Sequence, residues 1–269
     1  MPTNAPSRLF RCVVAALSIA VSSGCATPPD PSDTESYAEF RAINDPLEPL
    51  NRTVFEFNRA LDAMFLRPFA DFYRLLLPPP LQNRVHNFLA NLRSPVILVN
   101  DLLQGEWERA GTTTQRFLIN TTLGVGGLGD PASNFGLPAH SEDFGQTLAV
   151  WGLSEGPFLM MPLIGPSNPR DATGLAVDSF IIDPLGLLNS LGAEGEWLPT
   201  FLLGRFGLTA IDARAQNVEE LDDLEKSSLD FYAAMRSLYR QFRTAEIHQG
   251  QPPGVQGPSL DDFPAIPPE

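Results

Sequence analysis

Proline is the feature that most limits what this chain can fold into. The sequence holds 26 prolines in 269 residues, about twice the usual frequency of roughly 5%. Because proline lacks a backbone N–H and clashes with the preceding helical turn, such a chain cannot consist of long unbroken helices or central strands. Apolar residues make up 43% of the chain, which excludes wholesale disorder. We therefore expect an all-α fold of many short amphipathic helices punctuated by proline.

The charge of the chain narrows the range of partners. The formal net charge is −14, whereas nucleic-acid binding requires clustered Lys and Arg to neutralise phosphate. We therefore expect no nucleic-acid partner, and no docking on anionic lipid through net charge.

Residues 1–24 have the layout of a secretory signal peptide. Arg8 and Arg11 form its basic start, and the ten residues Cys12–Val21 form a mostly apolar core that is too short to span a membrane. Small residues then precede Cys25, a pattern similar to a bacterial lipobox, so we predict lipidation at Cys25. Ordinary cleavage after small residues is the alternative. With Cys12 removed, Cys25 would be the only cysteine and no intramolecular disulfide could form.

The mature chain divides into three parts. Residues 25–43 are polar and contain three prolines, which predicts a lipidated tether. Ala26, rather than Asp, follows Cys25, which favours the outer membrane under the sorting rule of enteric bacteria. Residues 44–243 form one helical domain, and residues 244–269, rich in Pro and Gly, are expected to be a disordered tail.

Helical spacing of apolar residues, together with proline and cap residues at the starts, predicts the elements of this domain. No run of residues shows a convincing strand alternation. The acids at 219–225 are expected to form a solvated helix face. The expected helices are Asp45–Phe65, Pro68–Leu77, a third over 85–92, a fourth from Ser94 to Gly105, Glu106–Ile119, Arg170–Ile182, Pro184–Leu191 and a long last helix from about Leu208 to Arg243.

The middle of the chain is almost free of charge. No Lys or Arg occurs between Arg116 and Arg170, and nine of the 21 glycines lie there. The uncharged run from Gly156 to Pro169 is too short and too rich in proline for a spanning helix. It is either a buried loop or a segment that faces lipid or lines a pore.

Two short motifs suggest enzyme chemistry, and the sequence around them argues against it. Gly152–Gly156 matches G-x-S-x-G, but a nucleophile elbow needs a following helix that Pro157 disfavours. The only later histidine is His248, in the predicted tail. Gly124–Gly129 matches G-x-G-x-x-G without a surrounding βαβ unit, which favours a flexible hairpin or hinge over a nucleotide site. We expect no catalytic residue, and a lipid-active hydrolase using Ser154 stays as the alternative.

The run His140–Asp143 could be a metal or acid–base cluster, but the rest of the sequence argues against it. Besides His140, the chain has only His86 and His248, so the three ligands of a catalytic zinc are not convincingly present. Ser141 as an N-cap with acids in the first helical turn is the simpler prediction. We expect no metal and no cofactor.

A series of ordered motifs over about residues 40–240 resembles the MlaA (VacJ) family of outer-membrane lipoproteins. The motifs are NDPLEPLNR (44–52), FNRALD (57–62), LRP (66–68), NFLANLRSP (87–95), LLQG (102–105), RFLINTTLGVGGLGD (116–130), EDFGQTLAVWG (142–152), GPFLMMPLIGPS (156–167) and RDATG (170–174).

This resemblance implies a ring-shaped helical domain embedded in the outer membrane from its periplasmic side. It implies an amphipathic channel that takes mislocalised phospholipids from the outer leaflet and passes them to a soluble periplasmic carrier similar to MlaC. It also implies a neighbouring trimeric porin and no covalent chemistry. A purely structural lipoprotein associated with the porin is a further alternative.

The weakly charged middle segment suits the wall of such a channel. Four glycines in six residues leave the backbone few steric limits, so we expect the Gly124–Gly129 turn to be a mobile gate. The residues predicted to line the lipid path are Gly124, Gly126, Gly127, Gly129, Phe158, Met160, Met161, Leu163 and Ile164.

Overall fold

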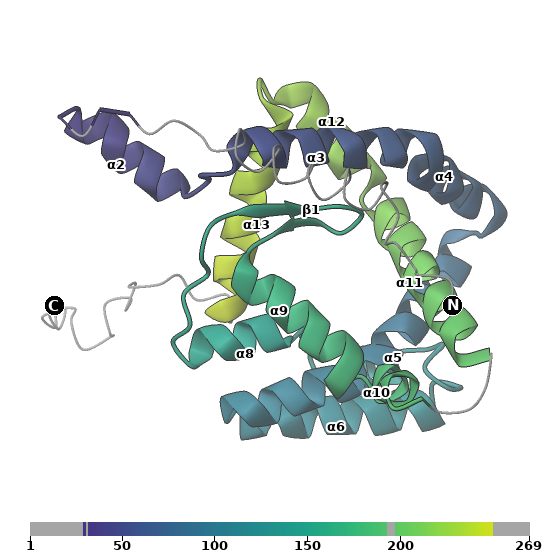
Figure 1. The fold of residues 1–269 in the computed structure, drawn as a ribbon. Helices are drawn as coiled ribbons and strands as arrows, with labels where there is room; N and C mark the ends of the chain where they lie inside the picture. Colours follow the sequence, from purple (N-terminus) through teal and green to yellow (C-terminus); the bar gives the residue numbers. More distant parts are fainter. Residues whose placement is uncertain (1–28, 31, 193–196, 250–269) are drawn as a thin grey trace, which may run out of the picture.

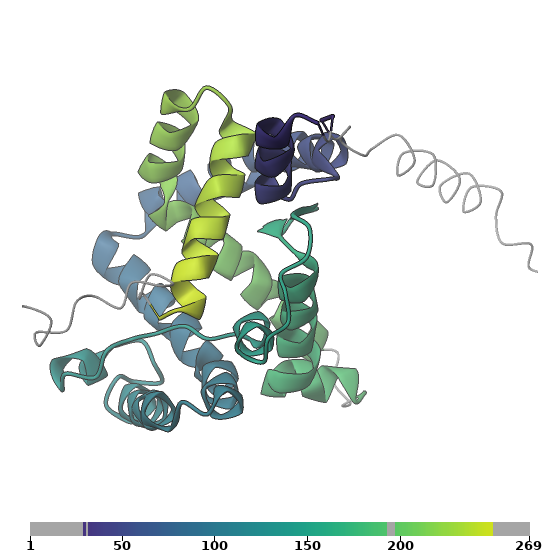
Figure 2. The same cartoon turned by 90° about the vertical axis from the view of Figure 1, so that its left-hand side faces the viewer.

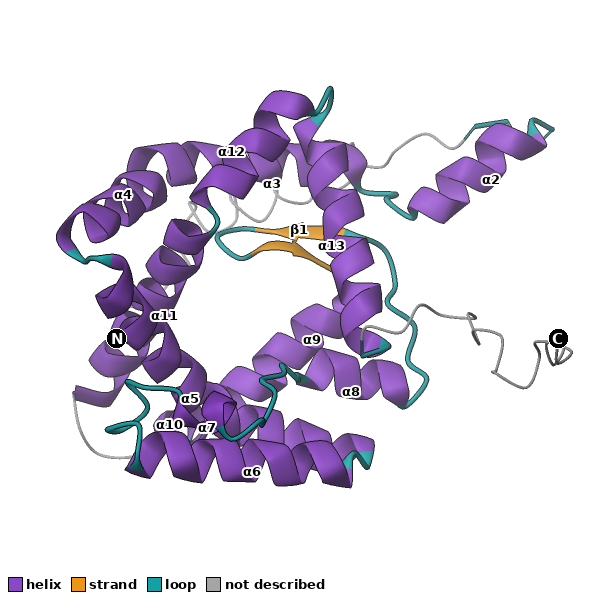
Figure 3. Ribbon diagram, turned by 180° about the vertical axis from the view of Figure 1, so that it is seen from behind, coloured by secondary structure: helices purple, strands orange, loops and turns teal. Residues whose placement is uncertain are grey.

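The structure, a computed structural model, describes residues 29–30, 32–192 and 197–249. Its helices are arranged in a ring, with α3 and α4 on one side and α6, α8 and α10 on the opposite side (Figure 1). α5 and α11 complete one flank, and α13 completes the other, as the view from behind also shows (Figure 3). The expected all-α, ring-shaped architecture is confirmed.

The described elements are, in chain order, α2 (Thr34–Ile43), α3 (Glu48–Leu61), the π-helix η1 (Asp62–Leu66), α4 (Arg67–Leu76), α5 (Pro79–Gln104), α6 (Trp107–Thr122), α7 (Pro131–Asn134), α8 (Phe144–Val150), β1 (Leu159–Met161), β2 (Gly165–Ser167), α9 (Pro169–Val177), the π-helix η2 (Asp178–Ile182), α10 (Pro184–Ser190), α11 (Trp197–Gln216), α12 (Val218–Ser227) and α13 (Phe231–Ile247).

The first two expected helices form one continuous rod. α3 runs into the π-turn η1, whose bond joins the N–H of Arg67 to the carbonyl of Asp62, and α4 follows without a break. Pro68 does not interrupt the rod because it lies in the first turn of α4, where its missing N–H costs little. We call the unit α3–η1–α4 the rod.

The third and fourth expected helices are likewise one helix. α5 passes through Pro95 and ends at Gly105, which has a left-handed φ of 81°. Proline inside a helix removes a single bond, here to the carbonyl of Asn91, at a cost of about 3 kcal/mol. Extensive packing of α5 against α6 offsets that cost, so the separation predicted at Ser94 was wrong.

The predicted last helix is three helices, which Figure 2 shows folding back on one another. α11 ends at Gln216, and α13 restarts where the carboxylate of Asp230 accepts from the N–H of Ala233 at 3.1 Å. Asp230 is the N-cap signal that the apolar spacing concealed. α13 continues to Ile247, four residues beyond the expected boundary at residue 243.

The ends of the chain modify the predicted domain plan. Part of the expected tether is helical, because α2 occupies Thr34–Ile43 and ends at Asn44 in the left-handed region. The predicted signal peptide, Cys25 and residues 250–269 of the expected tail lie outside the described residues.

The uncharged middle run forms a short antiparallel hairpin that the sequence pattern did not predict. Leu159 pairs with Ser167, and Met161 pairs with Gly165. With three residues in each strand, the hairpin is shorter than the alternation needed to recognise a strand. It lies on the inner side of the ring, between α3 and α9 (Figure 1).

Candidate functional site

The distribution of polar and apolar side chains is inverted relative to an ordinary soluble protein. Many large apolar side chains on the rod, α6, η2, α10 and α11 are exposed to solvent. The largest fully buried side chains are polar, and they are Gln146, Glu142, Asn100, Asn168, Thr147, Asp45 and Asp101. An exposed apolar exterior of this extent indicates a membrane or protein contact surface.

Helix α4 shows how the sequence builds this surface. Ala70 and Tyr73 lie against α11 in a small core with Ala215. On the opposite face, the side chains of Phe69 and Phe72 are each 55% exposed and that of Leu75 is 81% exposed. Phe69, Phe72 and Leu75 are each three residues apart and form one stripe, and Ala70 and Tyr73 form a second stripe turned away from it. One stripe stabilises the fold, and the other is exposed.

The described part of the chain contains no helix that is both long enough and apolar enough to cross a membrane.

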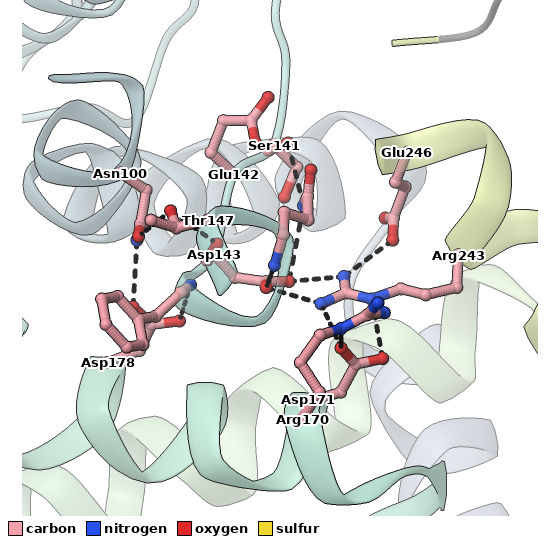
Figure 4. A network of polar contacts seen from close by, with 12 residues as sticks. Asn100, Ser141, Glu142, Asp143, Thr147, Arg170, Asp171, Asp178, Arg243 and Glu246 are labelled. Atoms are coloured by element: carbon pink, nitrogen blue, oxygen red, sulfur yellow. Dashed lines mark hydrogen bonds and ion pairs between the residues drawn. The ribbon is translucent and has the colours of Figure 1, made fainter. Parts of the chain in front are cut away.

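The polar interior holds α5, α8 and η2 together (Figure 4). Asn100 donates to Asp178 at 3.0 Å, and the hydroxyl of Thr147 donates to Asn100 at 2.7 Å. The N–H of Phe144 also donates to Asp178, at 2.9 Å. Burial raises the pKa of Asp178 in spite of these bonds. The cluster is saturated with internal partners, so it acts as a scaffold.

Glu142 lies at the edge of the same cluster. It accepts hydrogen bonds from Gln104 at 2.9 Å and from Arg109. Burial raises its pKa, although the charge of Arg109 opposes the change. The cap of α8 is Asp143, which accepts from the N–H of Gln146 at 2.9 Å. Ser141 was therefore the wrong residue for the predicted N-cap, because α8 begins only at Phe144.

Arg243 forms a second ionic centre between α8, α9 and α13 (Figure 4). Its guanidinium group donates two bonds to Asp143, at 2.7 and 2.6 Å, and two to Asp171, at 2.8 and 3.0 Å. Burial alone would raise the pKa of each carboxyl, but the hydrogen bonds and charge of Arg243 hold both values below normal. Periodicity could not reveal this centre, since its three members are far apart in sequence.

Close approach of two helices fixes the geometry of that centre. α8 and α9 meet at Gly145 and Gly174, where a Cβ on Gly174 would lie only 2.3 Å from the backbone nitrogen of Gly145. Any larger side chain at residue 174 would push the helices apart and separate Asp143 from Asp171.

Two asparagines on α3 hold the β-hairpin in place. Asn51 donates to the carbonyl of Phe158 at 3.0 Å and accepts from the N–H of Met160 at 2.9 Å. Asn58 repeats this pattern with the carbonyl of Met161 at 3.0 Å and the N–H of Leu163 at 2.9 Å. The two amides thus take the place of a neighbouring strand. The repeated Asn-Arg pair, seven residues apart, was a signal that could have identified them.

The predicted lipid-path residues of the hairpin divide into two groups. Phe158 and Met160 are buried in a core cluster with Phe55 and Tyr232. Leu163 and Ile164, at the hairpin tip, are exposed, and Met161 is half-buried. Only the tip residues and Met161 are therefore placed to contact a mobile ligand in this conformation.

The glycine turn is separate from the hairpin and packs against α5 and α6. Gly126 and Gly127 donate to the carbonyls of Thr121 and Asn120, each at 2.9 Å. Gly127 has a φ of 91°, and a Cβ there would lie 2.6 Å from that of Asn91. Gly127 thus has a packing role, whereas Gly126, with a φ of 70°, borders open space. The predicted gating role stays a prediction.

The motifs considered for catalysis have the wrong surroundings. Ser154 is exposed and follows helix α8, and the hairpin comes after it, so it lacks the strand–turn–helix context of a nucleophile elbow. His140 contacts Asp101 at 3.0 Å and Thr113 at 3.1 Å. Among the described residues, no three His, Cys, Asp or Glu side chains are grouped to hold a metal ion.

Similarity to known proteins agrees with this geometry. The chain is 31% identical to the intermembrane phospholipid transport system lipoprotein MlaA of Haemophilus influenzae over 242 residues, covering 89% of this chain and 91% of that protein. It is 34% identical to the protein of the same name from Escherichia coli K12, over 74% of this chain and 76% of that protein. An uncharacterized protein of Rickettsia felis is 37% identical, over 76% of this chain and 78% of that protein.

A solved structure described as the structural basis for maintenance of bacterial outer membrane lipid asymmetry has the same fold. It superposes with a TM-score of 0.62 at 35% sequence identity, covering 74% of this chain and 96% of that chain. The family model described as MlaA lipoprotein matches residues 43–246. From this match and these relatives, the chain belongs to the MlaA lipoprotein family.

Proposed function

We propose that this protein removes mislocalised phospholipids from the outer leaflet of the outer membrane and thereby maintains lipid asymmetry. The lipids would pass through an amphipathic path in the ring to a soluble periplasmic carrier. The relatives named as phospholipid transport lipoproteins support the transport role. The finer steps are our inference from the arrangement of side chains.

The observation that carries the proposal is the inverted distribution of side chains. Apolar side chains such as those of Phe69 and Leu75 are exposed around the ring, while polar side chains such as Gln146 fill the interior. Without lipid, such an exterior would make the protein aggregate. In the periplasmic leaflet it would be covered by acyl chains, and the ring would sit in the membrane without a spanning helix.

In this proposal the ring lowers the free-energy cost of moving a phospholipid across a leaflet. Moving a phospholipid between leaflets is costly because the charged headgroup must cross hydrocarbon. A path with a polar wall for the headgroup and an apolar opening for the tails lowers that cost. We place the exposed hairpin tip, with Leu163 and Ile164, at the tail side of this path and the glycine turn at its far end.

The anchor and the partners belong to the same proposal. Lipidation of Cys25 would tether the domain to the outer membrane, and a trimeric porin would lie beside the ring. A carrier similar to MlaC would receive the lipid on the periplasmic side. The name of the MlaA relatives supports a lipoprotein with a place in an intermembrane transport system. The porin, the carrier and the choice of Cys25 are our inference.

The outer-leaflet phospholipid content of a deletion strain tests the proposal. We expect phospholipid to accumulate there and sensitivity to detergent plus chelator to rise, with both reversed by the wild-type gene. The Ser154→Ala variant should complement fully, because its hydroxyl has no elbow around it. Normal lipid asymmetry in the deletion strain would contradict transport, and failure of Ser154→Ala at normal protein levels would revive a hydrolase.

A further inference from the structure

A row of arginines runs along one side of the rod. Arg59, Arg67 and Arg74 are seven or eight residues apart, and each pairs with a carboxylate on α12. Arg74 contacts Glu219 at 2.6 Å, and Arg67 makes two bonds to Asp222, at 2.5 and 3.0 Å. Arg59 pairs with Glu225. The three acids are three residues apart, so they lie along one stripe of α12. We call these three pairs the zipper.

The π-turn keeps this row on one side of the rod. In an uninterrupted α-helix, residues seven apart share a face, but residues eight apart are turned by about 80°. The eight-residue step from Arg59 to Arg67 spans η1, and a π-turn accommodates one residue more than an α-turn. The extra residue therefore returns Arg67 and Arg74 to the side of Arg59, opposite the acids of α12.

Besides the zipper, Asp222 lies 3.8 Å from Arg214 of α11, which itself pairs with Asp62 of the rod. Val218 is the only buried residue of α12 among those described, and the close backbone neighbour of α12 is α13. α12 lies beside α3 and α4 at the rim of the ring (Figures 1 and 3). The three ion pairs bridge the two elements. The ion pairs are partly exposed, so salt screens them. The acids at 219–225, expected to be a solvated face, are in part this contact surface.

Uncovering the row would change what the rod can bind. Its guanidinium groups would then be exposed on the side of the rod away from the aromatic face that includes Phe69 and Phe72, where Glu56 and Asp71 are their remaining partners. An apolar face opposite a polar face that carries basic residues is the composition of a helix that lies on anionic lipid. Arginine also binds phosphate with the two-bonded geometry that Asp222 now occupies.

We propose that α12 is an electrostatic latch that masks the arginine row of the rod from the phosphate groups of anionic phospholipids. The latch itself stands on the ion pairs alone, while the choice of lipid phosphate as ligand rests on the proposed function. Proteolysis tests the latch and vesicle binding tests the ligand, and the deletion strain tests the proposed function independently.

The only lysine in the chain provides a reporter of latch opening. Lys226 lies in the last turn of α12, so a lysine-specific endoproteinase can cut at that position alone. Proteolysis of a transiently opened segment follows the population of the open form. The cleavage rate of the detergent-solubilised full-length protein should rise between about 0.05 M and about 0.5 M sodium chloride. An isolated peptide covering residues 218–233 corrects for the effect of salt on the protease.

Adjacent acids on α12 give matched variants. Asp222→Asn and Glu219→Gln break zipper pairs, and Asp223→Asn and Glu220→Gln change charge equally at residues with no ion pair in the described structure. We expect the zipper variants to be cut roughly two- to five-fold faster at low salt, with a weaker response to added salt. The control variants should match the wild type. The double variant Arg74→Glu with Glu219→Arg should restore slow cleavage, because neither residue has a second ion-pair partner in the described part of the chain. Such a rescue distinguishes latch opening from misfolding.

Vesicle binding tests the masked ligand. With phosphatidylglycerol vesicles, Asp222→Asn should bind more tightly than Asp223→Asn, by up to about five-fold for each uncovered arginine. The two variants have the same net charge, so a difference reports the exposed row. Cleavage that ignores salt, or zipper variants that behave like their controls, would overturn the latch. Equal binding of both variants to the vesicles would overturn the masking of a phosphate-binding row.

Discussion

At the scale of single residues, two neighbouring glycines allow the cost of a positive φ to be measured separately from the cost of a steric clash. Gly126 and Gly127 both have positive φ, but only Gly127 faces a close neighbour, Asn91. Alanine in the left-handed region costs about 1–2 kcal/mol, so Gly126→Ala should destabilise the domain by that amount. Gly127→Ala should cost about 1–3 kcal/mol more, because Asn91 must move. Denaturant unfolding in detergent, followed by helical circular dichroism, measures both values. Equal losses would show that the close approach to Asn91 is relaxed at no cost.

The same pair decides whether the turn is a gate. If mobility matters, Gly126→Ala should disturb lipid asymmetry even though the domain stays folded, because it stiffens the backbone without a clash. Wild-type asymmetry in that variant would leave the turn a purely structural role. The four glycines were recognisable in the sequence, but the contact that fixes Gly127 comes from α5, which no local pattern could place.

At the scale of elements, the hydrogen bonds by which Asn51 and Asn58 of α3 hold the hairpin give a direct prediction. Asn58→Ala removes the acceptor of the Leu163 N–H and the donor to the Met161 carbonyl. Hydrogen exchange at Leu163 should therefore accelerate, while the amides of α13 keep their protection. Thr53→Ala is the matched control on α3, because its hydroxyl bonds only the carbonyl of Pro49 in the same helix. Unchanged exchange at Leu163 would show that strand pairing alone holds the tip.

The helices and strands also show how much of the secondary structure could be predicted from the sequence. Proline and apolar spacing correctly predicted helical structure through most of the rod, α5 and α6. They misplaced the boundaries between helices, because Pro95 lies inside α5 and Pro68 lies inside the rod. Tertiary packing decides whether a proline ends a helix. The π-turn and the three-residue strands leave no periodic signal. The family resemblance implied the ring, but it did not reveal the hydrogen bonds of Asn51 and Asn58 to the hairpin, or the zipper.

At the scale of the whole molecule, Arg243 joins the end of the chain to its middle and so closes one side of the ring. It is the shared partner of Asp143 and Asp171, and all three side chains are largely buried. Removing one member of a buried ionic group leaves the others uncompensated, typically at about 3–5 kcal/mol. We expect Arg243→Met to lose about that much stability at neutral pH, whereas Arg240→Met, which removes a more exposed pair with Glu155, should lose much less.

The pH dependence of this loss identifies its electrostatic origin. Both carboxyl groups have lowered pKa values in the folded protein, so their ionised forms stabilise it above the unfolded pKa of about 4. That stabilisation disappears as the pH falls through the lower folded values. In Arg243→Met the two carboxyls lose their cation, and burial then raises their pKa values. The difference in unfolding free energy between wild type and variant should therefore begin to shrink above about pH 4, where the raised carboxyls of the variant take up protons, and should go on shrinking as the pH falls through the lowered values of the wild type. Denaturant titrations at several pH values measure this difference, and a gap that stays constant with pH would mean that Arg243 acts through packing rather than charge.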